Sequence, residues 1–283
     1  MSQYSSKWLK VSEPFPHVLH VELARAPVNA FSVEFWTAYG KLFDTLTEDG
    51  YDVRALVVSS AFPKIFTAGI DLSDLSGQGA IVSANSPDNA RAAMQTRKQL
   101  LAFQSAIGAP ERTPFPVIAA LHGHVIGLGV DIIGPCDIRY AASNTSFIIK
   151  ATPDIGTLAF LPKITGNHSL VRELTYTSRP FSAAEAEKFG LVSKVVAGGR
   201  EEVIKEALEL AKVVAAKSPV AVASAKHLIT HSRDHTVAEN LASTAAWNAA
   251  ALQTNDIAAN LQAALGKQKA SFPPLAVPTK SKL

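Results

Sequence analysis

Cysteine is nearly absent from this sequence of 283 residues, in which Cys136 is the only one. A single cysteine excludes an intrachain disulfide and fits a reducing compartment. Cys136 lies in an apolar stretch, where it is expected to be a small buried hydrophobic residue rather than a nucleophile. The fold must therefore be stabilised mainly by its hydrophobic core.

Excess charge of one sign and long apolar runs are also lacking. With 27 lysines and arginines against 24 aspartates and glutamates, the net charge is +3, which is too small to favour a nucleic acid as partner. No apolar run reaches the ~18 residues of a membrane span, and the N-terminus lacks the apolar centre of a signal peptide. Hydrophobic residues make up 47% of the chain and charged residues 18%, which is typical of a folded protein with a large core.

What the chain has instead is an alternation of strands and helices. Runs of β-branched and apolar residues predict strands over Trp8–Val11, Val18–Leu23, Ala55–Ser59, Val117–Leu121, Ile138–Ala141 and Phe147–Ile149. Helical spacing and capping signals predict helices over residues 32–47, 90–107, 182–190, 200–217 and 219–267. The first two-thirds therefore indicate an α/β layer structure with parallel strands, and the last third is expected to be helical throughout.

Local signals refine this pattern at four places. Pro14 and Pro16 are expected to separate the first two strands, and the small polar residues 77–89 predict a loop. Ser182 and Glu185 have the spacing of a capping box. Asp137 is expected to pair with Arg139 or with a backbone group rather than to take part in catalysis.

Two glycine-bearing segments, each following a buried strand, carry the chemistry. The first is Phe66-Thr67-Ala68-Gly69-Ile70-Asp71-Leu72, and the second runs from His122 to Asp131 with glycines at 123, 127 and 129. A turn that opens a helix leaves free backbone N–H groups. Two such groups directed at one oxygen form an oxyanion hole, which stabilises the enolate made when a proton is removed beside a thioester carbonyl.

Together these segments, followed by Cys-Asp-Ile-Arg-Tyr-Ala, resemble the crotonase (enoyl-CoA hydratase/isomerase) superfamily. The stretch LPKITGNHSLVRELTYTSRPFSAAEAEKFGLVSKVV resembles its dienoyl-CoA isomerase branch, and the resemblance runs from about Val18 to Phe272. It implies an α/β fold, a crotonase-like spiral of ββα units with a C-terminal helical trimerisation region. The implied division is a spiral core over 1–200, the trimerisation region over 201–273 and a tail over 274–283.

The resemblance also implies which residues bind substrate. The oxyanion hole falls on the backbone N–H groups of Ile70 and Leu128, next to Ala68, Gly69 and Gly127. The family usually has glycine where this chain has Leu128, so the side chain adds bulk beside the thioester. Lys267 matches a lysine that reaches coenzyme A across subunits; the alternative is a solvated charge at a helix end.

The acid–base groups that the resemblance implies are incomplete. Asp131 matches an acid three residues past the oxyanion glycine, but the usual glutamate proton donor is replaced by Ala151. Asp154 best matches the aspartate that takes the first proton, which requires about five fewer residues between Lys150 and Thr157 than in the family pattern. A second alignment places Asp154 on an earlier, non-catalytic aspartate and deletes the base instead.

Three interpretations of the activity remain open. The first is an isomerase that shifts a 3,5-dienoyl-CoA to a 2,4-dienoyl-CoA, with Asp154 and Asp131 as its acids. The second is an acyl-CoA-binding relative without turnover, and the third is an error in the encoded sequence around residues 150–157. A hydratase-like enzyme is disfavoured, because the two glutamates of that reaction are Asp131 and Ala151 here.

Partners and location follow from the same features. The expected ligand is a fatty acyl-CoA thioester, and no separate cofactor is expected because coenzyme A is part of the substrate. No histidine or carboxylate spacing indicates a metal site, and the resemblance implies a homotrimer or homohexamer. The C-terminal Ser281-Lys282-Leu283 is a peroxisomal address that an import receptor reads.

Overall fold

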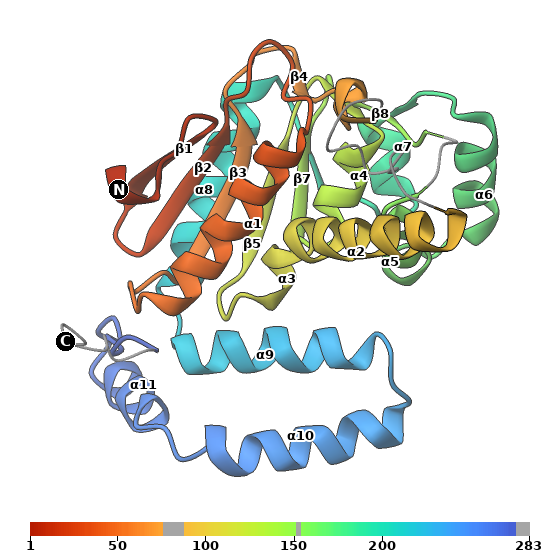
Figure 1. The fold of residues 1–283 in the computed structure, drawn as a ribbon. Coiled ribbons are helices and arrows are strands. Elements are labelled where there is room, and N and C mark those ends of the chain that lie inside the picture. The colour runs from red at the N-terminus through yellow and green to blue at the C-terminus, as the bar shows by residue number, and fades with distance from the viewer. Residues whose placement is uncertain (76–87, 151–153, 276–283) are drawn as a thin grey trace.

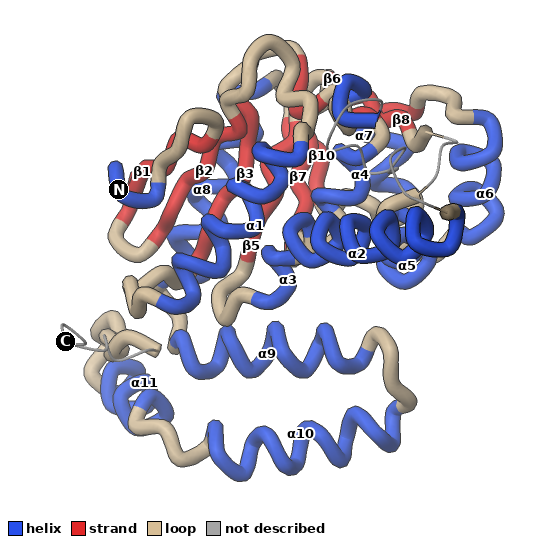
Figure 2. The backbone as a smooth tube through the Cα atoms, in the orientation of Figure 1, coloured by secondary structure: helices blue, strands red, loops and turns tan. Residues whose placement is uncertain are grey.

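The computed structural model describes residues 1–75, 88–150 and 154–275. In this part of the chain, helices pack on two sheets, and a group of three helices lies below this body (Figures 1 and 2). Residues 76–87, which include most of the expected loop 77–89, residues 151–153 and the tail from residue 276 fall outside the described residues. Asp88 and Asn89, the end of the expected loop, are the N-cap and the first residue of a helix.

The larger sheet has six strands in the order β1-β2-β3-β5-β7-β10. β1 and β2 are antiparallel, and every other neighbouring pair is parallel. The strands are β1 Leu9–Phe15, β2 Val18–Leu23, β3 Ala55–Ser60, β5 Val117–Leu121, β7 Ile138–Ala142 and β10 Lys194–Val196. All five strands predicted here are confirmed to within a few residues, β1 being the one that extends furthest.

The smaller sheet has four short strands in the order β4-β6-β8-β9. They are β4 Ile65–Thr67, β6 His124–Ile126, β8 Ser146–Ile148 and β9 Phe181–Ser182. Along the chain, β3 leads into β4, β5 into β6, and β7 into β8, and each pair is followed by a helix. This repetition is the spiral of ββα units that was expected.

Four helices that cover the sheets begin and end within a few residues of the predicted positions, namely α1 Val33–Glu48, α2 Asn89–Ile107, α7 Ala183–Lys188 and α8 Arg200–Ala215. α4 Leu128–Ile133 follows the second glycine-bearing turn, as expected. No helix was predicted at α3 Ala109–Arg112, α5 Thr157–Ile164 or α6 His168–Thr177, and there are short 3₁₀ turns at η1 Ser2–Tyr4 and η2 Leu72–Leu75. Ser32 caps α1 by accepting a hydrogen bond from the Phe35 N–H.

The larger sheet separates two hydrophobic cores. Alternate residues of β3 show the division: Leu56 and Val58 belong to the core under α1, whereas Ala55 and Val57 belong to the core under α8. The expected division at residue 200 would separate α8 from the sheet on which it packs. In the structure, the part that projects from the body begins with α9.

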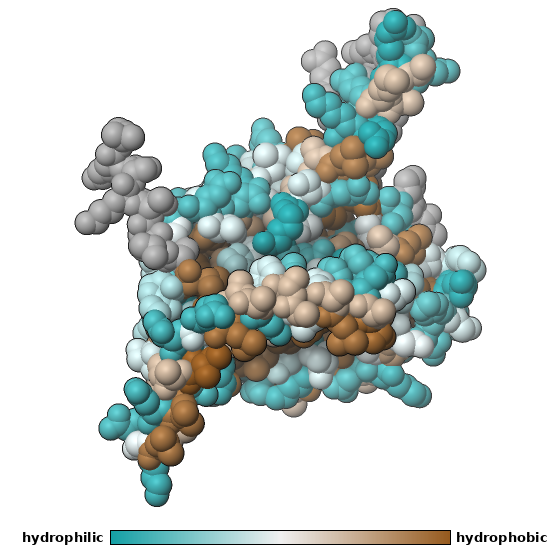
Figure 3. Space-filling model, turned by 90° about the horizontal axis from the view of Figure 1, so that it is seen from below, coloured by the Kyte–Doolittle hydropathy of each residue, from teal (hydrophilic) through white to brown (hydrophobic). Residues whose placement is uncertain are grey.

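The C-terminal arm consists of α9 Pro219–Ser232, α10 Val237–Ala251 and α11 Asp256–Leu265, and it lies below the body of the molecule (Figure 1). α10 has no buried residue. Large apolar side chains of the arm are exposed, namely Ile229, Val237, Leu241, Trp247, Leu252, Ile257, Leu261 and Leu265. The view from below shows hydrophobic patches among hydrophilic residues over this face (Figure 3).

Three local predictions were wrong in detail. Pro14 lies inside β1, where a register shift between Ser12 and Phe15 accommodates its missing N–H. The stretch 219–267 is three helices rather than one, because Thr236 caps a new helix. Glu185 completes only half of the capping box, since its carboxylate binds Arg179 instead of the N-cap backbone. None of the described helices is long and apolar enough to cross a membrane.

Candidate active site

The two glycine-bearing turns lie next to each other because their strands are neighbours. β4 and β6 pair in parallel, with Thr67 opposite Val125. The carboxyl ends of parallel strands meet at the same edge of a sheet, so the turn after β4 and the turn into α4 leave this edge together. Gly69 and Gly127 therefore come from distant parts of the sequence into one place.

Gly69 permits the close approach of the two turns. Its φ is +97°, a conformation that side chains disfavour. A Cβ atom at this position would lie 2.8 Å from the Ile126 carbonyl oxygen and 3.5 Å from the Leu128 nitrogen. Only glycine fits between these backbones, so the Ala68-Gly69-Ile70 turn and the Gly127-Leu128 turn form one surface.

The Ile70 N–H is turned away from the neighbouring backbone. A parallel bridge joins Phe31 to Ile70: the Phe31 N–H donates to the Gly69 oxygen at 2.8 Å, and the Asp71 N–H donates to the Phe31 oxygen at 3.0 Å. These bonds use the groups on either side of Ile70, so its own N–H points in the opposite direction. Among the described residues, none accepts a hydrogen bond from it.

The Leu128 N–H also has no acceptor in the part of the chain that the structure describes, but for a different reason. Leu128 is the first residue of α4, and the first N–H groups of a helix have no partner within the helix. Its side chain is 5% exposed and belongs to the hydrophobic core under α1. The Leu128 side chain, which stands where the family usually has glycine, therefore lies largely in the hydrophobic interior.

Asn29 supports the first turn, and sequence reasoning missed it. Its side chain is fully buried and donates to the carbonyl oxygens of Leu23 and Phe66. Its backbone oxygen accepts a hydrogen bond from the Thr67 hydroxyl at 2.6 Å. The sequence feature that could have indicated this role is a single asparagine among apolar residues after a strand. If such an amide is buried, it must form hydrogen bonds, and backbone groups are the nearest partners.

Asp131 caps a helix other than its own. It lies in the first turn of α4 and is 6% exposed. Its Oδ1 atom accepts hydrogen bonds from the N–H groups of Gly156 at 2.8 Å and Thr157 at 2.9 Å, at the start of α5. Burial raises the pKa of Asp131 above its ordinary value, and the nearby charge of Asp154 raises it further.

Asp154 lies at the same helix start. Its Oδ2 atom accepts a hydrogen bond from the Leu158 N–H at 3.2 Å. Asp154 is an exposed residue, but partial burial of its carboxyl group removes some of its hydration and raises its pKa. The structure therefore brings Asp131 and Asp154 together at the N-terminus of α5, with Asp131 one turn along α4 from Leu128.

Lys267 lies far from these groups in its own chain. It is exposed, follows α11 and has a φ of +51°. Figure 1 shows α11 and α4 at opposite ends of the molecule. The structure therefore does not bring Lys267 together with the two turns and the two acids of its own chain.

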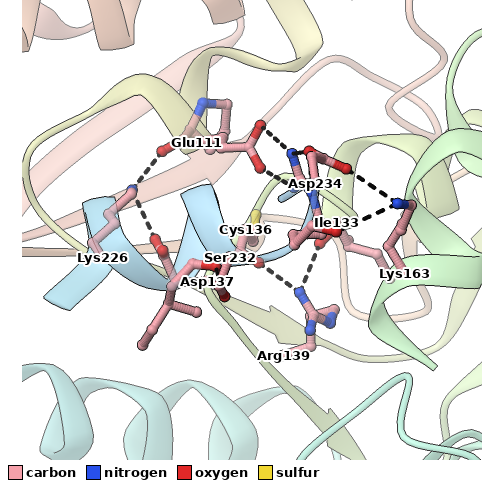
Figure 4. Close-up of polar contacts among 12 residues, drawn as sticks. Glu111, Ile133, Cys136, Asp137, Arg139, Lys163, Lys226, Ser232 and Asp234 are labelled. Atoms are coloured by element: carbon pink, nitrogen blue, oxygen red, sulfur yellow. Dashed lines mark hydrogen bonds and ion pairs between the residues drawn. The ribbon is translucent and has the colours of Figure 1, made fainter. Parts of the chain in front are cut away.

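The contacts of three other polar residues, His122, Cys136 and Asp137, indicate structural roles rather than catalytic ones. The His122 ring is buried and hydrogen-bonds the Phe62 oxygen through Nε2, and the buried Cys136 thiol has a pKa raised to about 12 by burial. Asp137 was expected to pair with Arg139 or with a backbone group. Its carboxylate accepts a hydrogen bond from the Val117 N–H at 2.7 Å, which confirms the backbone alternative, and its ion pair is with Lys226 at 2.8 Å rather than with Arg139 (Figure 4). Within the described ranges, no group of three or more histidines, cysteines or carboxylates is placed to hold a metal ion.

The fold and the paired turns define a class of acyl-thioester enzymes, and comparison with known proteins identifies the family. The family described as "Enoyl-CoA hydratase/isomerase" matches residues 16–274. The chain belongs to this family.

Individual relatives cover most of the chain. It is 43% identical over 266 residues to the mitochondrial Delta(3,5)-Delta(2,4)-dienoyl-CoA isomerase of Homo sapiens, covering 92% of this chain and 80% of that protein. It is 37% identical to the peroxisomal enzyme of the same name from Arabidopsis thaliana, covering 90% and 92%. A crystal structure of enoyl-CoA hydratase from Bacillus anthracis superposes with a TM-score of 0.83 at 27% identity, covering 94% and 99%.

Proposed function

We propose that this protein is a dienoyl-CoA isomerase, which converts a 3,5-dienoyl-CoA to a 2,4-dienoyl-CoA. The observation that carries the proposal is the pairing of two free amides, Ile70 and Leu128, with two carboxylates of raised pKa, Asp131 and Asp154. The relatives at 37–43% identity that carry this name support it.

The chemistry requires only proton transfer. With the thioester oxygen between the Ile70 and Leu128 N–H groups, Asp154 removes a proton from C2 and leaves a trienolate that extends to C6. Return of a proton at C6, from Asp131 or from water, forms the C2=C3 and C4=C5 double bonds. Because no electrons are gained or lost, the substrate's own coenzyme A suffices and no other cofactor takes part.

The two amide donors stabilise the negative oxygen of this intermediate. Loss of one such donor costs about 3–4 kcal/mol in comparable sites. A carboxylate with a raised pKa suits reversible proton exchange near neutral pH, because it is both a stronger base and an acid that is available at that pH. Both features are therefore needed for isomerisation, whereas binding needs neither carboxylate.

Binding without turnover is the alternative that one observation favours. Residue 151 is alanine, so the side chain that serves relatives as a proton donor is missing, and Ala151 lies outside the described residues. A purified-protein assay decides between the two. An isomerase raises the conjugated 2,4-dienoyl-CoA absorbance in proportion to enzyme, whereas a binding protein gives a calorimetric signal with dienoyl-CoA and no absorbance change.

Assembly and location complete the proposal. The exposed apolar side chains of the C-terminal arm support a homotrimer or homohexamer, in which Lys267 reaches coenzyme A bound to a neighbouring copy. The terminal Ser281-Lys282-Leu283 supports import into peroxisomes by the receptor for this signal. Relatives of the same name are described as mitochondrial or peroxisomal.

A further inference from the structure

The helix α5 connects the two acids to a different part of the molecule. Its first residues donate N–H groups to Asp131 and Asp154. Its later residues, Phe160 and Lys163, contact the turn that follows α9 in the C-terminal arm. A helix of eight residues joins these two sets of contacts.

Arg233 is at the centre of the contacts with the arm. Its guanidinium carbon lies 5.2 Å from the centroid of the Phe160 ring, and its nitrogens form ion pairs with Glu111 of α3 and with Asp234. A cation over an aromatic face is attracted by the ring, and the planar guanidinium can stack there while it binds a carboxylate. One side chain thus joins α3, α5 and the arm.

Lys163 reinforces this joint from the α5 side. Its ammonium group lies 3.3 Å from the Asp234 carboxylate and donates to the Arg233 carbonyl oxygen at 3.3 Å. Figure 4 shows Lys163 and Asp234 directed toward each other, with Glu111 on the other side. The arm therefore contacts both the Phe160 ring and Lys163 in the second half of α5.

The Arg233 contacts are shielded compared with an ordinary surface pair. The side chains of Arg233 and Glu111 are each 23% exposed. The nearby pair Arg112–Asp44 has exposures of 48% and 54% and does not involve α5. Partial burial strengthens an ion pair and reduces its screening by salt.

We propose that Arg233 is a positioning residue, which couples the placement of the C-terminal arm to the placement of Asp154 through α5. The coupling to catalysis rests on the proposed isomerase function. A short hydrogen-bonded helix moves as a unit, so a shift of Phe160 and Lys163 displaces the N–H groups that hold Asp131 and Asp154. Small displacements of an acid–base group lower the rate of proton transfer without removing the group.

The test compares Arg233→Met with Arg112→Met, which breaks the exposed pair and leaves α5 untouched. For Arg233→Met we expect kcat with a dienoyl-CoA to fall roughly three- to thirtyfold, less than the ~100-fold or greater effect of losing an acid–base group. KM should stay within about twofold, and the acid limb of the kcat–pH profile should shift. Arg233→Lys should recover only part of kcat, because lysine keeps the charge but not the stacked fork. Arg112→Met should match the unaltered protein.

Hydrogen exchange provides a readout that needs no substrate. In Arg233→Met, the amides of Gly156, Thr157 and Leu158 should exchange faster, whereas those of α1 should not change. If the unaltered protein turns over no dienoyl-CoA, the exchange experiment still tests the coupling, and only the proposed function fails.

A second variant, Phe160→Leu, separates the coupling through α5 from an indirect effect of altered assembly. Phe160→Leu removes the ring beneath the guanidinium and keeps the ion pairs of Arg233, so it should show the same changes in weaker form. The proposal is overturned if both variants keep the oligomeric state of the unaltered protein and leave kcat and α5 exchange unchanged. Faster exchange with unchanged kcat in an active enzyme would also overturn it.

Discussion

At the scale of single residues, the two acids have different surroundings and different roles are expected of them. Asp131 is buried and bound to two backbone N–H groups, whereas Asp154 accepts one such bond and is exposed. A base must reach the substrate, and the more accessible Asp154 is better placed to do so. Asp131 is expected to act more on the position and pKa of its neighbour.

Asp154→Asn tests the first of these roles. We expect the isomerase rate to fall at least about 100-fold, because the base is lost, while calorimetry shows dienoyl-CoA affinity within a few-fold of the unaltered protein. Asp131→Asn should lower the rate less. Asp44→Asn, which alters an exposed carboxylate on α1, serves as control. Unchanged turnover in Asp154→Asn would favour the alignment in which the base is deleted.

Asp131→Asn has a separate, pH-dependent effect on stability. Because the pKa of Asp131 is raised on folding, the folded protein binds a proton more readily than the unfolded chain, and the charged form opposes folding. The amide can still accept both N–H bonds. The variant should therefore have the higher free energy of unfolding above the folded-state pKa, and this gain should disappear as the pH falls toward ~4, the unfolded value.

Urea unfolding at a series of pH values measures the difference. A difference in the free energy of unfolding that is the same at pH 8 and at pH 4 would contradict the raised pKa. Asp44→Asn again provides the matched control, since its exposed carboxylate should show no comparable change with pH.

At the scale of elements, α9 is fastened to the body by Lys226. Its ammonium group is buried and donates to the Pro110 and Phe115 carbonyl oxygens, the Thr113 hydroxyl and the Asp137 carboxylate at 2.8–3.0 Å. Figure 4 shows the lysine directed from α9 toward Asp137. Four acceptors around one cation compensate for its loss of hydration.

Lys226→Met should therefore destabilise the protein strongly. Removing one partner of a buried ion pair leaves an uncompensated charge and costs roughly 3–5 kcal/mol. Urea unfolding should show this loss, and adding Asp137→Asn should recover part of it because the unpaired carboxylate is removed. If the double variant loses the full sum of the two single effects, the pair is not the source of the stability.

The elements themselves could largely be predicted from the sequence. Strands such as β3 and β5 are short β-branched runs between breakers, and α1 shows a clear apolar stripe after its capping serine. The proximity of the two glycine turns could also be predicted, because neighbouring parallel strands end at the same edge of a sheet. The break between α9 and α10 was missed, although Thr236 and Glu239 form a capping box there.

Contacts between distant residues could not be predicted in the same way. Asp137 directly precedes β7 and lies two positions from Arg139, so local spacing favoured that ion pair, but its ion-pair partner Lys226 is 89 positions away. The capping of α5 by Asp131 could not be predicted either. Asp131 belongs to α4, and only the packing of the two helices brings its carboxylate to Gly156. Such partners depend on tertiary geometry, which local periodicity does not encode.

At the scale of the whole molecule, the terminal tripeptide determines the expected location. A fluorescent fusion that leaves Ser281-Lys282-Leu283 at the C-terminus should be peroxisomal in cells, because the import receptor reads this signal. Deleting Leu283 should leave the fusion in the cytosol. An unchanged distribution after the deletion would show that this signal does not direct the protein.

Assembly is expected to use the exposed apolar side chains of the arm. Leu241 on α10 and Leu261 on α11 are 63% and 61% exposed, and exposed apolar patches of this kind mark association surfaces. Light scattering should give a trimer or hexamer of the 30.0 kDa chain. Leu241→Glu combined with Leu261→Glu should shift the mass toward a monomer, because charges would have to be buried, while circular dichroism keeps the helical signal.

The same variant tests the role of Lys267. If Lys267 binds a coenzyme A phosphate of a neighbouring copy, Lys267→Met should weaken dienoyl-CoA affinity roughly tenfold, the loss of one charge-assisted hydrogen bond. Affinity for a pantetheine thioester, which lacks those phosphates, should not change. In the monomeric background, Lys267→Met should cause no further loss, because no neighbour is present to supply the lysine. An equal loss in both backgrounds would contradict action across subunits, since it would require the distant Lys267 to reach the site of its own chain.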